Sequence, residues 1–224
     1  MTFGMKGSVM AENIIGASQA AIDAYEAEAL AIFGRVGQRM QQLVTSAFAL
    51  TYEGPDAETT FNPGLLKLAT ESVTLINDAM TSFAEAVSAV TSNISRSLGA
   101  PEIVFVYKPP PLELPPAPGV AADDYRIDIT GFETFLSTDL PDAQTAIAGL
   151  FAGNRDAFNA IPRATADSPG WSGEARDYAQ NVVVPNQTEN LNAILNQVVA
   201  EIADFMTNAK DGTLRADQAG VVGG

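Results

Sequence analysis

Residues 64–98 read GLLKLATESVTLINDAMTSFAEAVSAVTSNISRSL, and this stretch decides the fold. Apolar residues recur along it with alternating steps of three and four, at Leu66, Ala69, Val73, Ile76, Met80, Phe83, Val87, Val90 and Ile94. This spacing is the a/d seam of a long amphipathic helix that packs nearly parallel to another helix. Such a helix needs a partner of similar length, because its apolar stripe would otherwise face water.

The preceding segment, residues 12–51, supplies a partner of the required length. Its apolar residues keep a strict seven-residue register, at Ile15, Ile22, Ala29, Val36, Leu43 and Leu50. Residues 52–56 and 61–64 then carry two breaks rich in Pro and Gly, which stop and restart a helix. Residues 1–100 are therefore predicted to form one helical hairpin with its bend at about 52–64.

A connector of different character follows at residues 101–119. Residues 102–107 are β-branched and aromatic, which favours a short strand or extended segment. Residues 108–118 hold six prolines and favour a semi-rigid polyproline spacer of about 3.1 Å per residue. The same prolines are also typical of ligands for aromatic-lined grooves, which is the less favoured interpretation.

The second half repeats the plan of the first. Residues 125–129 alternate like a short strand, for which residues 102–107 are a candidate partner. Helical spacing then returns at Phe132, Phe135, Leu136, Ile147, Phe151, Phe158 and Ile161, with a restart at Pro141. After a polar turn, a last helix is expected to reach about Ala209, with a kink near Pro185 and an apolar stripe at Ala175, Tyr178, Val182, Leu191, Ile194, Val198, Ile202 and Phe205.

These patterns predict an all-α protein made of two long helical hairpins. The second hairpin covers residues 120–216, with its bend at 162–173, and residues 217–224 are expected to be a flexible tail. The connector at 101–119 joins the two units and carries the short extended segments. Because each seam would otherwise expose an apolar stripe, the hairpins are expected to pack together as an elongated four-helix bundle.

The composition excludes several classes of function. The 224 residues include 12 Lys and Arg, 27 Asp and Glu, and no His or Cys, for a formal net charge of −15. Zinc sites, thiol nucleophiles and histidine-based triads need residues that are absent. Lys and Arg are scattered singly, so no basic patch predicts binding to nucleic acid or to anionic lipid.

The same sequence predicts no membrane span, since no stretch approaches the roughly 18 consecutive apolar residues that a span needs. No secretory signal peptide follows Lys6, because Glu12 and Asn13 interrupt the apolar stretch. The expected location is outside the cell or at its surface without a cleaved signal peptide. The alternative is a cytoplasmic or particle-associated protein.

The most specific motif is Trp171-Ser172-Gly173 at the second bend. An indole can plug the end of a bundle while its N–H finds a polar partner, and glycine allows a tight turn, so a structural cap is the favoured role. The motif, in a Cys-free two-helix unit of about 100 residues, also resembles the WXG family of small hairpin proteins handled by type VII secretion systems.

This resemblance covers residues 120–216 with the motif intact. Over residues 10–99 it rests on helix lengths and bend position, and Phe61, Asn62, Pro63 and Gly64 stand where Trp-x-Gly is expected. If both halves belong to this family, the chain resembles a fused pair. Such a pair is the covalent equivalent of the heterodimers that WXG proteins and their PE/PPE relatives form.

The resemblance also implies an export signal. Family members often carry Tyr-x-x-x-Asp/Glu just after the second helix of a hairpin. Tyr52 and Asp56 fit this pattern, but they lie at the bend of the first hairpin, where a helix-ending loop is the favoured interpretation.

Acidic residues are the remaining candidates for chemistry, because paired carboxylates can run glycoside hydrolysis or hold metals. The nearest clusters are Asp123 with Asp124, Asp139 with Asp142, Glu174 with Asp177, Glu201 with Asp204, and Asp156 alone. Without histidine the Glu-x-x-His pattern of di-metal bundles cannot be assembled. We therefore expect solvated faces and helix caps, no metal, no cofactor and no enzymatic activity, with a two-carboxylate hydrolase as the least favoured class.

The leading hypothesis is a non-enzymatic, secretion-associated protein that acts by protein–protein interaction. Its partners would be the secretion machinery, an exported effector or another copy of itself. The alternative is a structural subunit of an oligomeric particle or filament, from a phage or a cell surface. That alternative is motivated by residues 102–107 and 125–129, which are candidates to pair within or between chains.

Overall fold

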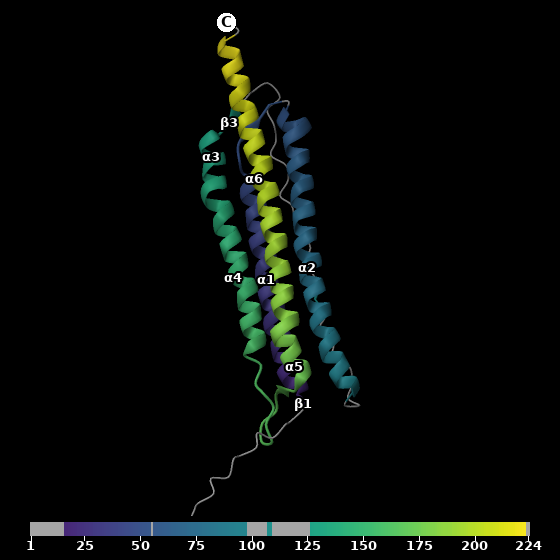
Figure 1. Ribbon diagram of the computed structural model, residues 1–224. Coiled ribbons are helices and arrows are strands. Elements are labelled where there is room, and N and C mark those ends of the chain that lie inside the picture. Colours follow the sequence, from purple (N-terminus) through teal and green to yellow (C-terminus); the bar gives the residue numbers. More distant parts are fainter. Residues whose placement is uncertain (1–15, 55, 98–106, 109–125, 223–224) are drawn as a thin grey trace, which may run out of the picture.

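The computed structural model describes residues 16–54, 56–97, 107–108 and 126–222, and four long helices dominate it (Figure 1). These helices are α1 (Gln19–Phe48), α2 (Asn62–Ser97), α4 (Leu140–Asn159) and α6 (Val184–Val222). Short helices lead into the last two, α3 (Ile129–Thr134) and α5 (Glu174–Tyr178). Three π-helical turns and four two-residue strands complete the described part: η1 (Ala57–Phe61), η2 (Phe135–Asp139), η3 (Ala179–Val183), β1 (Gly16–Ala17), β2 (Tyr52–Glu53), β3 (Arg126–Ile127) and β4 (Trp171–Ser172).

The four long helices form an elongated bundle in which neighbours run in opposite directions (Figure 1). Helix α1 packs mainly against α4, α2 packs mainly against α6, and α4 also packs against α6. Contact between α1 and α2 is less extensive. The predicted all-α fold of two hairpins is confirmed, and each hairpin makes its largest helix contacts with the other hairpin.

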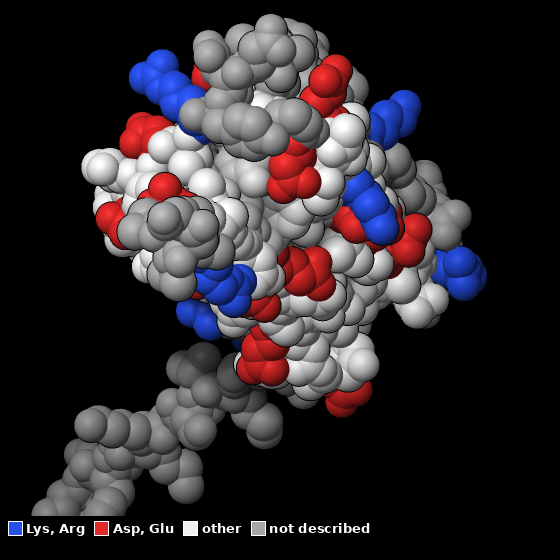
Figure 2. Space-filling view, turned by 90° about the horizontal axis from the view of Figure 1, so that it is seen from above, with Lys and Arg blue, Asp and Glu red and all other residues white. Residues whose placement is uncertain are grey.

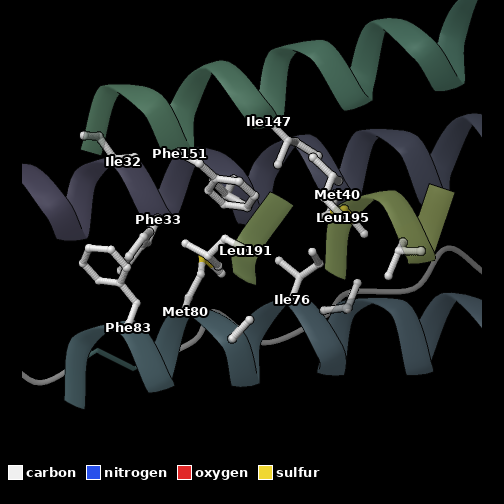
Figure 3. Close-up of a cluster of buried hydrophobic side chains, with 14 of the residues drawn as sticks. Ile32, Phe33, Met40, Ile76, Met80, Phe83, Ile147, Phe151, Leu191 and Leu195 are labelled. Atoms are coloured by element: carbon white, nitrogen blue, oxygen red, sulfur yellow. The ribbon is translucent and has the colours of Figure 1, made fainter. Parts of the chain in front are cut away.

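Side chains from all four helices meet in one core (Figure 3). Of the eight predicted seam positions of α2 whose side chains the structure describes, six are buried, at Ala69, Val73, Ile76, Met80, Phe83 and Val87. Leu66 was expected in the same seam, but it is 43% exposed and Leu65 is buried in its place. An α-helix drifts by roughly 20° per heptad from a perfect 3.5-residue repeat, so the residues that form the seam change at the first turns of α2.

The three π-helical turns share one cause. Each is followed by a proline at the second residue of the next α-helix, at Pro63, Pro141 and Pro185. Proline has no N–H and its ring displaces the carbonyl four residues earlier, so the preceding turn widens. The residue before each proline donates its backbone N–H to the carbonyl five residues back: Asn62 to Ala57, Leu140 to Phe135, and Val184 to Ala179.

The π-helical turn before Pro185 also changes which residues of the last hairpin face the core. Tyr178 and Val182 were expected in the apolar stripe, but their exposed fractions are 55% and 38%. Ala179 and Val184 are buried instead. A π turn holds more residues than an α turn, so an apolar stripe traced back from the later part of the helix reaches the wrong residues.

Helix α6 extends through Val222, so residues 217–222 continue this helix and are not the separate tail that the sequence analysis predicted. Most of the proline-rich connector lies outside the described residues, as do Ile15 and residues 102–106. Tyr107 is described, and its buried ring packs edge-on against Phe33 at a centroid distance of 5.0 Å. None of the described helices is both long and apolar enough to cross a bilayer.

The strand predicted at residues 125–129 is present as the two residues of β3, and residues 102–106 of its candidate partner lie outside the described residues. β3 pairs antiparallel with β2 in the bend of the first hairpin, with Tyr52 opposite Ile127 and Glu53 opposite Arg126. A two-residue strand has no hydrophobic alternation to identify its partner, so its pairing depends on how the hairpins pack.

Candidate functional site

The two ends of the bundle are built alike. At one end, β1 leads into α1 and pairs with β4 in the bend of the second hairpin, where Ala17 faces Trp171 and Gly16 faces Ser172. At the other end, β3 leads into α3 and pairs with β2 in the bend of the first hairpin. The strand that leads into each hairpin is thus paired with the bend of the other hairpin.

Backbone hydrogen bonds repeat this correspondence. The N–H of Ser18, the N-cap of α1, donates to the carbonyl of Gly170 at 2.8 Å, one residue before β4. The N–H of Asp128, the N-cap of α3, donates to the carbonyl of Thr51 at 3.1 Å, one residue before β2. Both bonds join a helix start to the residue before a bend strand, so the two ends are related by an approximate two-fold symmetry.

The glycine after each bend strand completes the repeat. Gly54 has φ of 125° and Gly173 has φ of 112°, and they are the two described residues with clearly left-handed φ. Residues other than glycine rarely adopt this backbone conformation. The counterpart of Trp171-Ser172-Gly173 is therefore Tyr52-Glu53-Gly54.

The structure corrects the position of the degenerate motif expected at residues 61–64. Phe61 ends η1, while Asn62, Pro63 and Gly64 form the first turn of α2. A Cβ atom on Gly64 would lie 2.9 Å from the ring of Phe205, so this glycine allows α2 and α6 to approach closely. These residues therefore pack helices together and do not occupy the place of Trp-x-Gly.

Trp171 fills the end of the bundle that carries β1. Its side chain is fully buried, and its ring lies edge-on to Phe158 at a centroid distance of 5.6 Å. The indole N–H was expected to find a polar partner, but it has none within the part of the chain that the structure describes. The described contacts of Trp171 are thus those of a packing residue.

Arg176 is a buried residue that stabilises the same bend. It is 3% exposed, and its Nη2 donates to the carbonyl of Ile161 at 2.7 Å, near the end of α4. Its Nη1 donates to Gln180 at 2.7 Å. Burial lowers the pKa of the guanidinium, and nearby Arg163 lowers it further, while Asp177 raises it.

The opposite end of the bundle carries a groove of about 900 Å³ between the bend of the first hairpin, β3 and the last turns of α6. Aromatic rings form its apolar part. Tyr52 stacks on Phe61 at 4.5 Å, and Phe61 stacks on Phe205 at 5.5 Å. Among the described lining residues, the charged ones are the carboxylates Glu53, Asp56 and Asp217 and the cation Arg126. Figure 2 shows this end from above, with acidic side chains across the middle and basic ones mostly toward the edge.

Tyr52 and Asp56, the residues of the candidate export signal, both line this groove. The Tyr52 hydroxyl donates to Oδ2 of Asp56 at 3.2 Å and lies 3.5 Å from the hydroxyl of Thr213 on α6. Partial burial raises the pKa of Tyr52; the bond from Thr213 lowers it, and the charge of Asp56 raises it. The pair therefore belongs to a contact between the first bend and α6.

The groove offers apolar contact area with carboxylates beside it, an arrangement that suits the binding of another molecule. Among the described residues, no group of three or more acidic side chains lies close enough together to hold a metal ion. Tyr52 and Asp56 were predicted from the sequence but the groove was not, because the last helix was expected to end near Ala209. An available signal was the repeated spacing along α6, which continues at Gly212 and Ala216.

Comparison of the chain with protein-family models, with curated proteins and with solved structures finds no match.

Proposed function

We propose that this chain is a covalent pair of WXG-like hairpins that acts by protein–protein interaction, as an export substrate or export partner of a type VII secretion system. The observation that carries the proposal is the repeated bend, an aromatic residue followed by any residue and a left-handed glycine, at Tyr52 and at Trp171. Each bend is paired with the lead-in strand of the other hairpin. Two hairpins that exchange such contacts resemble a heterodimer whose chains have been joined.

In this proposal the protein has no enzymatic activity and reaches the cell surface or the medium without a cleaved signal peptide. Tyr52 and Asp56 supply the export signal. In the family this signal follows the second helix of a hairpin, and Tyr52 contacts Thr213 near the end of the last helix. The pair is thus distant from that helix in sequence but beside it in space. Asp56 is exposed, so its carboxylate is available to a partner.

Secretion from a host with a type VII system tests the proposal. The full chain is expressed in the intact host and in the same host without the membrane ATPase of that system. Culture medium and cells are then compared by immunoblot, with a cytoplasmic enzyme as the lysis control. We expect the protein in the medium only when the ATPase is present. Equal release from both hosts would overturn the proposal.

The export signal is tested separately with the double variant Tyr52→Ala and Asp56→Ala. Glu58→Ala is the matched control, because Glu58 is an exposed acid on the adjoining π-helical turn. We expect the double variant to accumulate in cells and the control to be exported normally. Secretion that persists in the double variant would reject this pair as the signal while leaving the broader proposal standing.

The alternative, a structural subunit of a particle or filament, was motivated by extended segments available for pairing between chains. Arg126 and Ile127 are instead paired within the chain, with Glu53 and Tyr52. Light scattering separates the two functions. A monomer or small complex agrees with the export proposal, whereas rings or filaments would favour the structural subunit.

A further inference from the structure

The last turns of α6 project beyond the other helices of the bundle (Figure 1). Along α6 one seam runs with alternating steps of four and three, at Leu191, Leu195, Val198, Ile202, Phe205, Ala209, Gly212 and Ala216. The first four of these residues are buried, or nearly so, against the bundle. The last four line the groove. The seam therefore continues past the point where α6 has helices to pack against.

An a/d seam is the surface that another helix recognises, because its spacing matches knobs-into-holes packing. Beyond Phe205 the seam residues in the groove are small, at Ala209, Gly212 and Ala216, which lets a second backbone approach closely. A Cβ atom built on Gly212 meets nothing within 4 Å, so this part of the groove is open. Leu214, which also lines the groove, is 37% exposed.

The charges beside the groove favour some binding partners over others. Among the described lining residues, the carboxylates Glu53, Asp56 and Asp217 outnumber the cation Arg126, and the whole chain carries a formal charge of −15. A second copy would bring the same carboxylates against these three and repel them. Lysine or arginine beside the apolar stripe of an incoming helix would instead find acidic partners.

We infer that the groove formed by β2, β3 and the last turns of α6 binds an amphipathic helix of another protein. The apolar stripe of that helix packs on the aromatic rings and on the seam of α6. Its basic residues lie beside Glu53, Asp56 and Asp217. The inference rests on the proposed function, since it assigns a surface and a class of partner to the proposed protein–protein interaction.

Binding of a synthetic peptide to the purified full chain tests the inference. The probe is a fluorescein-labelled helical peptide of about 14 residues, or four turns, with Leu at a and d and Lys at e and g. Two control peptides carry Glu in place of Lys, or the same composition in shuffled order. Fluorescence anisotropy should show binding of the Lys peptide and binding at least roughly tenfold weaker for both controls. Equal binding of the shuffled peptide would overturn the inference, because charge alone would then explain the attraction.

Filling the groove provides the second arm of this test. Gly212→Leu places a side chain in the open space and should weaken binding of the Lys peptide by roughly tenfold or more. Gly149→Leu is the matched control, because Gly149 is an exposed glycine of α4 that also has nothing within 4 Å of its Cβ position. It should leave peptide binding unchanged. Leu214→Asp is a second groove variant in case Gly212→Leu fails to fold.

Unchanged peptide binding in folded Gly212→Leu or Leu214→Asp would place the peptide elsewhere and overturn the inference. A wild-type dimer that Gly212→Leu converts to monomer would also overturn it, in favour of a second copy as the occupant. Export and peptide binding are measured independently. If export does not depend on the ATPase but the peptide binds, the result counts against the proposed function. If export depends on the ATPase but the peptide does not bind, the result counts against the groove alone.

Discussion

Gly54 and Gly173 lie in corresponding positions at the two bends, and both have a left-handed backbone. The strands paired with these bends, β3 and β1, lie at opposite ends of the bundle (Figure 1). Each glycine follows a bend strand and accepts a hydrogen bond through its carbonyl near the start of the next helical turn, from Ala57 at 3.0 Å and from Asp177 at 3.1 Å. Gly173 has ψ of 174°, which places it in a region that is essentially restricted to glycine. The two bends therefore depend on glycine for the same reason.

Alanine at either glycine is predicted to destabilise the protein. Gly54→Ala and Gly173→Ala should each lower the free energy of unfolding by about 1–3 kcal/mol, because a Cβ atom strains this backbone. Gly149→Ala is the matched control in a helix, where alanine should raise stability by up to about 1 kcal/mol. Urea unfolding followed by circular dichroism measures all three. A bend variant as stable as the wild type would show that its backbone can relax.

Truncation of Trp171 is predicted to destabilise the second bend strongly. Trp171→Ala removes a fully buried ring and should cost about 3–5 kcal/mol, whereas Trp171→Phe should cost less. Leu214→Ala, at an exposed position, should change stability by less than about 0.5 kcal/mol. Trp171 is the single tryptophan, so its fluorescence should be blue-shifted in the folded protein and move to the red on unfolding. An unchanged melting temperature for Trp171→Ala would contradict the buried position.

Removal of the buried cation is predicted to weaken the contact between α4 and the second bend. Arg176→Met leaves the carbonyl of Ile161 without its donor and should cost about 1.5–3 kcal/mol. Arg163→Met is the control, because the bridge from Arg163 to Asp177 joins two side chains that are each about half exposed. Such surface pairs contribute about 0–1 kcal/mol. Equal effects of the two variants in thermal unfolding would contradict a special role for Arg176.

Alkaline pH is predicted to destabilise the fold through its buried tyrosines. Burial raises the pKa of Tyr107 from 10.0 to about 12, and it also raises the pKa of Tyr25. The folded state then holds these phenolic protons more tightly than the unfolded state. This contribution to stability is complete below pH 10 and is lost as the pH rises from 10 toward 12. Urea unfolding at a series of alkaline pH values measures the loss.

Tyr107→Phe should make this alkaline loss smaller without abolishing it, because Tyr25 remains. At neutral pH the variant should be as stable as the wild type or more stable, since the Tyr107 hydroxyl is buried without a hydrogen-bond partner among the described residues. Tyr178→Phe is the control at an exposed tyrosine. A Tyr107→Phe protein with the pH profile of the wild type would rule out titration of Tyr107 as a cause.

Sequence periodicity predicted the long helices because a helix buries one face with a regular spacing. It succeeded for the central seam of α2, where Met80 and Phe83 are fully buried. It failed for Tyr178 and Leu66, where a π-helical turn or a gradual drift changes the face that points inward. Prolines marked the helix restarts, but the spacing alone did not predict how many residues each turn would hold.

The candidate site was predicted only in part. Trp171 and Tyr52 were named from their motifs, yet their equivalence appears only when the strand pairings are known. Aromatic-x-Gly at both bends is a signal present in the sequence, although the position of Phe61 and Gly64 in the bend favoured them as the counterpart. The groove depends on the meeting of Phe61 with Phe205, residues that lie far apart in the chain.

The sequence by itself determined the four long helices, the two bends and the absence of His and Cys chemistry, because these follow from local spacing and composition. The tertiary structure decided the partners: α1 against α4, β1 with β4, and β2 with β3. An apolar seam shows that a helix must pack against another helix, but it does not identify that helix. A strand of two residues likewise does not specify its own register. Packing of the two hairpins fixes both pairings, and with them the groove beside Tyr52.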